Sequence, residues 1–276
     1  MFENLQAMPA DAILKLIAEY AGDERADKID LGVGVYRDEA GGTPILKSVK
    51  KAEQYLLENQ DTKSYLGSGG NAAFNAAITD LIFGDGASDN ARITTLQTPG
   101  GSGSLRVAAG VIKRALPGAT ILAGEPTWAN HVPLLSSAGI EMQSFPYYDA
   151  ESHDIHFDQM LAAVEQAADG SILLLHGCCH NPTGMDLSQE QWHEITDAVV
   201  RRNVVPFIDI AYQGFATGLH EDAYGVRHMI DAVPEMIVSG SCSKNFALYR
   251  DRVGSLSFVA RDASTAAILR SQANNI

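Results

Sequence analysis

Short apolar segments alternate with amphipathic segments along most of this chain, and this alternation constrains the fold more than any other feature. The apolar segments predict strands over Ile93–Thr98, Thr120–Ala123, Ile140–Phe145, Ile172–His176, Val204–Asp209, Met236–Ser239 and Val253–Ala260. Helical periodicity separates most of them, over Ser102–Ala115, His131–Ala138, Phe157–Ala168, Ser188–Arg202, Tyr224–Ala232 and from Ala263 onward. Strands joined by helices form a mostly parallel sheet covered on both faces, so we predict an α/β fold.

The first part of the chain has a different pattern. It predicts helices over Pro9–Tyr20, Ser48–Leu57 and Asn71–Phe83, and extended chain with turns over the glycine-rich segment Ile29–Thr43. No linker is evident after about residue 45, so we predict that the α/β region is one domain.

The charge and the cysteines limit the possible partners and location. The chain has 34 acidic and 20 basic residues, and its net charge is −14. Such a surface repels phosphate backbones and anionic lipids, which argues against nucleic acids and membranes as partners. Cys178, Cys179 and Cys242 are odd in number and two are adjacent, so a disulfide framework is disfavoured. With no secretory signal evident, we expect a reduced, cytoplasmic location.

Functional residues are expected after the strands, because ligands of such sheets bind beyond the carboxyl ends of the strands. Thr98–Ser104 joins a strand to a helix and is rich in glycine, so its backbone and the hydroxyl of Ser102 suit a phosphate; a flexible turn has the same composition. Asp209 ends an almost wholly apolar strand and Tyr212 follows it. A carboxylate there needs a cationic or donor partner, unless it only caps a turn.

Lys244 is the only lysine after Lys113. It follows a predicted buried strand among small hydroxyl residues, which favours a desolvated amine suited to Schiff-base chemistry over a lysine that points into solvent. Arg252 lies at the start of the next strand and, with Ser241 and Ser243, suits binding of a phosphate.

Two other connections carry polar residues. The segment His176–Gly184 contains two histidines and two cysteines, but adjacent cysteines form a poor zinc pair and no second half-site exists. We therefore expect no metal, and instead a fixed turn that directs the Asn181 amide into the site. After the second strand, Trp128 suits stacking on a planar ligand or core packing, and His131 suits orienting Asp209 or beginning a helix.

As a set, these motifs resemble those of the pyridoxal-phosphate-dependent aminotransferases of fold type I, in the aspartate and aromatic amino acid group. The matching segments follow in order: Leu31-Gly-Val-Gly-Val-Tyr-Arg, Thr98-Pro-Gly-Gly-Ser-Gly, Pro126-Thr-Trp-Ala-Asn-His, Asn181-Pro-Thr-Gly, Asp209-Ile-Ala-Tyr-Gln-Gly-Phe and Ser241-Cys-Ser-Lys-Asn-Phe-Ala-Leu-Tyr. The resemblance implies a transaminase that uses pyridoxal 5'-phosphate to move an amino group between an amino acid and a 2-oxo acid such as 2-oxoglutarate.

The resemblance also implies roles for individual residues. Lys244 is the amine that binds the cofactor as a Schiff base and moves protons. Asp209, supported by His131, is the partner of the ring nitrogen, and Asn181 and Tyr212 bind the ring oxygen. The other implied contacts are ring stacking by Trp128, phosphate binding by Gly101, Ser102, Ser241, Ser243, Arg252 and, across a dimer interface, Tyr65, and substrate binding by Gly34, Trp128 and Asn181.

For the chain as a whole, the resemblance implies a homodimer with shared active sites. It identifies residues 1–44 as an arm and the N-terminal part of a small domain, and residues 45–276 as the large cofactor-binding domain. Members of the family are longer, and their C-terminal segment supplies the substrate arginines, so we expect this chain to bind the cofactor but to transaminate poorly. Ser102 stands where aspartate-preferring members more often carry threonine, which favours aromatic substrates, but aspartate, aromatic amino acids or both stay open.

Other functions share some of these residues. Ser241-Cys-Ser-Lys244 fits the S-x-x-K pattern of serine acyl-enzymes, although the accompanying Ser88-Asp-Asn motif precedes it instead of following it. A decarboxylase or β-lyase of the same fold would also use Lys244 and Asp209. A fragment that binds the cofactor without turnover is the remaining alternative.

Overall fold

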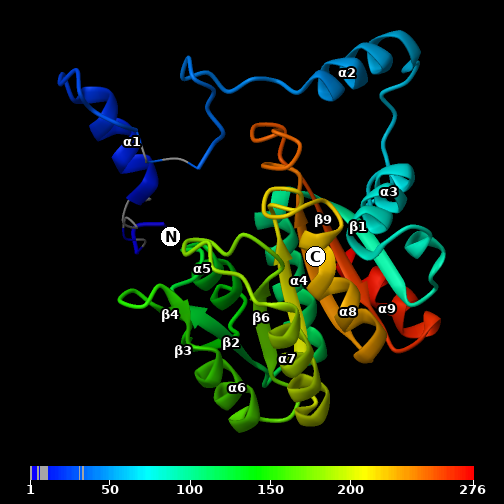
Figure 1. Cartoon of the computed structure of the whole chain (residues 1–276). Helices are drawn as coiled ribbons and strands as arrows, with labels where there is room; N and C mark the ends of the chain where they lie inside the picture. The colour runs from blue at the N-terminus through cyan, green and yellow to red at the C-terminus, as the bar shows by residue number, and fades with distance from the viewer. Residues whose placement is uncertain (1, 5, 7–11, 31, 33) are drawn as a thin grey trace. The chain divides into compact units, whose positions relative to one another are not determined.

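The chain divides into two units, Met1–Ile45 and Leu46–Ile276, in a computed structural model that describes residues 2–4, 6, 12–30, 32 and 34–276 (Figure 1). In the first unit, helix α1 covers Ala12–Gly22. The predicted helix start at Pro9, and Leu31 and Val33 of the glycine-rich motif, lie outside the described residues.

The other described residues of the first unit form extended chain and turns, in agreement with the prediction for the described part of 29–43. Its clearest anchor is Lys28, whose ammonium group donates hydrogen bonds to the carbonyl oxygens of Tyr20 and Asp23 at 2.7 and 2.6 Å. These bonds satisfy carbonyl groups at the end of α1 that have no partner within the helix.

The second unit is built on a seven-stranded sheet with the order β1-β9-β8-β7-β6-β2-β3. Strand β9 is antiparallel to its neighbours β1 and β8, and the other pairs are parallel. This arrangement confirms the predicted mostly parallel sheet. The strands are β1 (Ile93–Pro99), β2 (Thr120–Glu125), β3 (Glu141–Pro146), β6 (Ile172–His176), β7 (Val205–Ile210), β8 (Met236–Ser241) and β9 (Val253–Val259).

Helices cover both faces of this sheet (Figure 1). One face packs against α4 (Gly100–Ala115), α5 (His131–Ser136) and α9 (Ala263–Ala273). The other packs against α3 (Ala72–Phe83), α6 (Phe157–Gln166), α7 (Gln189–Arg202) and α8 (Tyr224–Ala232). Helix α2 (Lys47–Asn59) has no buried residue. Every described helix is too short or too polar to cross a membrane.

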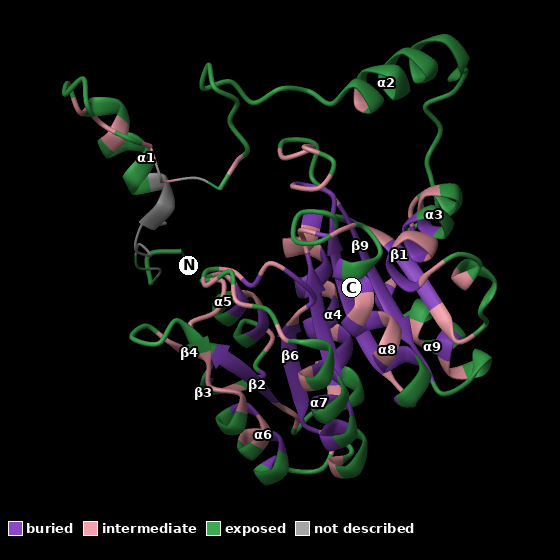
Figure 2. Ribbon diagram, viewed as in Figure 1, coloured by how far each residue is buried: buried purple, intermediate pink, exposed green. Residues whose placement is uncertain are grey.

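The apolar runs in the sequence reflect strands that are buried on both faces (Figure 2). In β6, Leu173 and Leu175 pack toward α6, α7 and α8, whereas Ile172 and Leu174 pack toward α4. Side chains alternate between the two faces, but each face has its own helical layer and needs apolar residues. Central strands therefore lack the polar alternation of a half-exposed sheet.

Most predicted elements are present, and the differences occur at their ends. Strand β8 extends to Ser241, because Gly240 and Ser241 pair with β9. Helix α4 begins at Gly100 and not at Ser102, so the glycine-rich segment forms its first turn. The hairpin of β4 (Tyr148–Asp149) and β5 (Asp154–Ile155) was not predicted, because strands of two residues carry no readable period.

Gly254 allows three elements to approach closely at the end of the sheet. A Cβ atom at this position would lie 2.5 Å from the carbonyl carbon of Gly100 and 2.7 Å from the carbonyl oxygen of Gly240. Both atoms are backbone and cannot move aside as a flexible side chain can. The absence of a side chain thus lets β9 lie directly against β8 and the start of α4.

The half-buried His176 ends β6, and the buried His180 lies in the turn that follows. The ring of His180 stacks on Tyr147 with 4.1 Å between centroids, and the ring of His176 lies 4.1 Å from that of His180. Both histidines line a small cavity together with Thr127 and Tyr147. Burial, with a smaller contribution from neighbouring histidine charges, lowers the pKa of His176 to about 3 and that of His180 to about 4.

These depressed pKa values predict that the free energy of unfolding falls as the pH decreases below about 6.5. Below this pH the unfolded chain binds protons that the folded chain does not, so each buried histidine costs about 1.4 kcal/mol per pH unit until its folded pKa is reached. Urea titrations at pH 7 and pH 5 measure the difference, to which His180 contributes about 2 kcal/mol. His180→Asn should therefore reduce the loss of stability between these pH values, and the exposed His153→Asn should not. Equal losses in the wild type and His180→Asn would contradict this account.

Candidate active site

The carboxyl ends of three neighbouring parallel strands bring the main polar residues together. In the sheet register His176 of β6 lies beside Asp209 of β7, which lies beside Ser239 of β8. The segments that leave these strands carry Asn181, Tyr212 and Lys244, respectively. Residues far apart in the sequence thus meet at one edge of the sheet.

Asp209 and His131 form a buried pair at this edge. The Nε2 atom of His131 lies 3.1 Å from Oδ2 of Asp209, and the His131 side chain is completely buried. Its Nδ1 atom lies 2.8 Å from the hydroxyl of Thr127. In the neutral imidazole, Nε2–H donates to the carboxylate and Nδ1 accepts from the Thr127 hydroxyl. The second interaction holds the ring that supports Asp209.

The surroundings of Asp209 keep its carboxyl group ionised. Burial alone would raise the pKa of Asp209, but the hydrogen bond with His131 outweighs burial and lowers it, together with the positive charge that His131 and His176 bear when protonated. A buried carboxylate of this kind is a strong partner for a cationic N–H group.

Lys244 lies in the turn that follows β8. Its side chain is half-buried, and Nζ lies 5.4 Å from the centroid of the Tyr212 ring. Burial lowers the pKa of Lys244 and the charge of Arg252 lowers it further, whereas the charge of Asp209 opposes them. The net decrease raises the share of neutral amine, the form that attacks a carbonyl group.

Tyr212 and Asn181 lie together at the same edge. Burial raises the pKa of Tyr212, as do the charges of Asp209 and Cys179, and a hydrogen bond with Asn181 partly opposes them. The phenol therefore stays protonated and can donate a hydrogen bond. The turn that carries Asn181 is held by Asp186, which accepts from the backbone N–H groups of Cys179 and His180 at 2.6 and 2.8 Å.

A cluster of donors surrounds the start of α4. Gly100 has a φ of +72°, and a Cβ there would lie 2.5 Å from Nη2 of Arg252. Arg252 donates through Nη1 to the hydroxyl oxygen of Ser243 at 3.2 Å. The hydroxyl oxygen of Ser241 accepts from the backbone N–H of Ser243 at 3.2 Å, and the Cβ of Ser241 lies 3.3 Å from a Cβ built at Gly101. A helix N-terminus, a guanidinium group and hydroxyl groups together suit an anion.

These residues fit pyridoxal phosphate in three respects. The donors at the start of α4, where a Cβ would fill the space beside Arg252, suit its phosphate. The buried carboxylate of Asp209 suits a protonated pyridine nitrogen, and the half-buried amine of Lys244 suits its aldehyde. Trp128 is half-buried, and its ring meets that of His131 edge-on at 5.3 Å between centroids.

Other predicted site residues are less closely joined to this cluster. Ser102 is half-buried in the first turn of α4. Tyr65 is fully exposed in the connection after α2. Gly34 is exposed in the first unit, and a Cβ there would have no neighbour within 4 Å. The structure does not join Ser241 to Lys244 as an acyl-enzyme requires, since among the described hydrogen bonds the Ser241 hydroxyl pairs with the Ser243 N–H.

Sequence reasoning missed several residues that shape the site. Thr127 fixes the His131 ring by a hydrogen bond. The sequence gives one indication of this contact, because Thr127 lies four residues before His131. Gly100 and Gly254 were missed as positions of close approach, because a single sequence does not distinguish a glycine required by packing from one in a flexible turn. His176 and His180 were considered only as metal ligands.

Comparisons with known proteins agree with this geometry. Residues 26–276 match the family model described as aminotransferase class I and II. The chain is 48% identical over 267 residues to an aspartate aminotransferase of Escherichia coli (strain K12), covering 96% of this chain and 67% of that protein. It is 48% identical over 273 residues to an aromatic-amino-acid aminotransferase of Pseudomonas aeruginosa, covering 98% of this chain and 68% of that protein.

A solved structure supports the same assignment. The crystal structure of an aromatic-amino-acid aminotransferase from Burkholderia pseudomallei, covalently bound to pyridoxal phosphate, aligns with a TM-score of 0.96 at 40% identity. The alignment covers 100% of this chain and 69% of that one. The fold agrees with that of this structure, and the chain belongs to the class I and II aminotransferase family.

Proposed function

We propose that this protein is a pyridoxal-phosphate-dependent aminotransferase that moves an amino group between an amino acid and a 2-oxo acid. The observation that carries the proposal is the half-buried amine of Lys244 in the electrostatic field of the buried carboxylate of Asp209. An amine of lowered pKa and a stably ionised carboxylate are the two groups that this chemistry requires of the protein.

When bound, pyridoxal phosphate supplies an electron-withdrawing ring that stabilises negative charge at the substrate α-carbon. Asp209 would hold a proton on the ring nitrogen, and His131 holds the Asp209 carboxylate in place. Lys244 would hold the cofactor through its amine and would move the proton of the substrate α-carbon. Asn181 and Tyr212 would donate hydrogen bonds to the ring oxygen.

In this proposal, the residues around the start of α4 bind the phosphate. Arg252 supplies a positive charge, Ser241 and Ser243 supply hydroxyl groups, and Gly101 and Ser102 supply N–H groups at the helix N-terminus. Trp128 would stack on the ring and, with Asn181, would contact the substrate.

Aspartate, aromatic amino acids or both are the proposed amino donors, with a 2-oxo acid such as 2-oxoglutarate as acceptor. Relatives with either specificity are equally similar to this chain, at 48% identity. Ser102 favours aromatic substrates, because aspartate-preferring members of the family more often carry threonine at this position.

We propose that residues 45–276 form the large cofactor-binding domain and residues 1–44 an arm and part of a smaller domain. The division of the chain between Ile45 and Leu46 supports this boundary. We also propose a cytoplasmic location, which the three free cysteines support. Alkylation during cell lysis measures whether these thiols are free in the cell.

A homodimer with shared active sites completes the proposal. Helix α2 has no buried residue, yet Tyr55, Leu56 and Leu57 lie exposed on it, and Tyr65 and Leu66 are exposed just beyond it. Large apolar side chains gathered on one segment indicate a surface that another chain covers. In a dimer, Tyr65 would reach the phosphate bound by the partner chain.

We expect sedimentation equilibrium to give twice the mass of the chain. Leu57→Asp places a charge on the exposed apolar segment and should shift the equilibrium toward monomer by at least tenfold. Leu116→Asp, which changes a less exposed leucine outside this segment, should not. A monomeric wild type at micromolar concentration would contradict the proposed dimer.

Lys244 should be the residue to which the cofactor attaches. After incubation with pyridoxal phosphate and reduction with borohydride, peptide mass mapping should find one cofactor per chain, on Lys244. Lys244→Ala should abolish this labelling, whereas Lys113→Ala, which removes a half-buried lysine of α4, should leave it unchanged. Labelling spread over surface lysines, or none at all, would overturn the proposed function.

Asp209 should contribute strongly to cofactor affinity. Hydrogen bonds to a charged group contribute about 1.5–3 kcal/mol, so Asp209→Asn should weaken the binding of pyridoxal phosphate by roughly 10- to 150-fold. The affinity is measured by titration of the cofactor absorbance. Glu125→Gln, which neutralises an exposed carboxylate at the end of β2, is the matched control and should bind as the wild type does. Equal affinity of Asp209→Asn and the wild type would refute the role of Asp209.

A further inference from the structure

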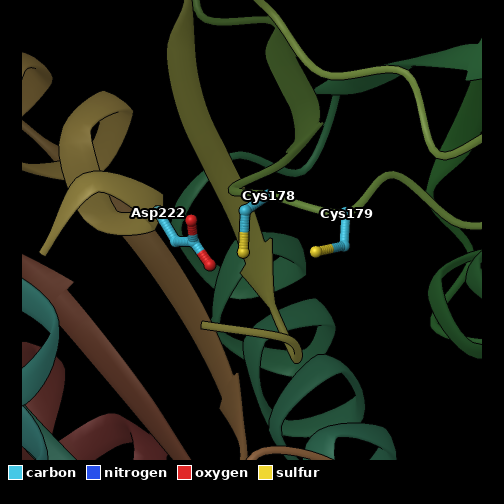
Figure 3. Close-up of side chains that lie close together, drawn as sticks. All are labelled: Cys178, Cys179 and Asp222. Atoms are coloured by element: carbon cyan, nitrogen blue, oxygen red, sulfur yellow. The ribbon is translucent and has the colours of Figure 1, made fainter. Parts of the chain in front are cut away.

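Two adjacent thiols lie side by side at the end of β6. Cys178 and Cys179 are free cysteines, and their sulfur atoms and a carboxylate oxygen of Asp222 all lie within 4.8 Å of one another. Figure 3 shows the Cys179 sulfur directed toward that of Cys178, with Asp222 on the other side of Cys178.

Asp222 has no free acceptor position for a further ligand. Its Oδ2 accepts from the backbone N–H groups of Gly214 and Ala216, and its Oδ1 accepts from those of Thr217 and Gly218, at 2.8–3.2 Å. A carboxylate offers about four acceptor positions, and all four are used. Asp222 therefore adds negative charge beside the sulfur atoms, but the donor set consists of two sulfurs.

The backbone and the spacing disfavour a direct disulfide between these cysteines. Adjacent Cα atoms across a trans peptide lie about 3.8 Å apart, whereas disulfides usually span about 4.4–6.8 Å. Cys179 already has a φ of +48°, an unfavourable region for a side chain of this kind. An atom bonded to both sulfurs makes the bridge between the two cysteines longer than a direct S–S bond. The short distance between adjacent Cα atoms then no longer opposes the bridge.

The two thiols differ in their access to solvent, so a ligand reaches one of them before the other. Cys178 is buried, whereas Cys179 is only half-buried. A ligand can thus bond first to Cys179 and then to the adjacent Cys178, where the second reaction is intramolecular and strongly favoured by proximity. Structural zinc needs four ligands, so a site with two sulfurs does not suit it. Two sulfurs do suit a thiophilic centre that binds two thiolates.

We propose that Cys178 and Cys179 together form a chelating dithiol site for trivalent arsenicals. An arsenic(III) centre with one organic group and two hydroxyl ligands binds both sulfurs. Two As–S bonds form and two As–O bonds break, and the two thiol protons leave with the hydroxyl groups as two molecules of water. The oxidation states of arsenic and sulfur do not change, so the step needs no oxidant or reductant.

The site lies on the same turn as Asn181, and Asp186 holds this turn through the N–H groups of Cys179 and His180. An arsenical bound there would be seated within the turn and not on the outer surface. The inference stands on the thiol geometry alone and does not depend on the proposed function.

Phenylarsine oxide is the probe, applied to the folded protein without cofactor and followed by native mass spectrometry. We expect one phenylarsenic group per chain that survives excess glutathione and is removed by a dithiol such as 2,3-dimercaptopropanol. A bridge between two sulfurs resists a monothiol in this way, whereas a bond to a single sulfur does not. Removal by glutathione, or no adduct on the wild type, would overturn the proposal.

Single substitutions of the three cysteines identify the sulfur atoms that bind arsenic. Cys178→Ser and Cys179→Ser should each lose the glutathione-resistant adduct, with circular dichroism reporting whether each variant is folded. Cys242→Ser removes the remaining buried thiol and should keep the adduct. Retention by either of the first two variants would overturn the pairing. A loss of two hydrogen masses before the probe is added would show a disulfide between the pair and would also overturn it.

Discussion

The charge of Asp209 is the constraint around which the rest of the site is arranged. A carboxylate buried at the end of a central strand is costly unless it is paired, and here His131 pairs with it at 3.1 Å. The partner must itself be fixed, and Thr127 fixes it. The pair leaves the carboxylate ionised, facing the edge of the sheet where Lys244 and Tyr212 lie. In the proposed function, a cationic ring nitrogen would use the remaining acceptor capacity of this carboxylate, and the buried charge would favour the cofactor over uncharged ligands.

The antiparallel strand β9 explains why the anion site lies beside this carboxylate. By inserting between β1 and β8, β9 brings the start of α4 next to the end of β8. Gly254 permits this approach, since any side chain there would meet the backbone of Gly100 and Gly240. The guanidinium group of Arg252, just before β9, then lies against Gly100. One strand thus joins the anion-binding helix start to the strand that leads to Lys244.

Much of this arrangement was predictable, because buried parallel strands and their helices have strong periodic patterns. The ends of β6 and α8 agree with their predicted ranges. Asp209 could be selected because it ends an almost wholly apolar strand. Lys244 could be selected as the only lysine after Lys113, and Arg252 from its place at the start of the next strand. Thr127 and Gly254 could not, since their importance depends on contacts with His131 and Gly100 that no local pattern encodes. The hairpin β4–β5 was missed for the related reason that two-residue strands have no period.

A protein with a net charge of −14 needs a specific arrangement of groups to bind a phosphate. Long-range attraction cannot contribute, because the overall field repels anions. Binding must therefore come from groups that act at contact distance: the N–H groups at the start of α4, the hydroxyls of Ser241 and Ser243, and Arg252. Such contacts depend on geometry more than on total charge. These residues favour a phosphate only at the point where they come together. The rest of the acidic surface repels polyanions, so a site of this kind selects a small ligand.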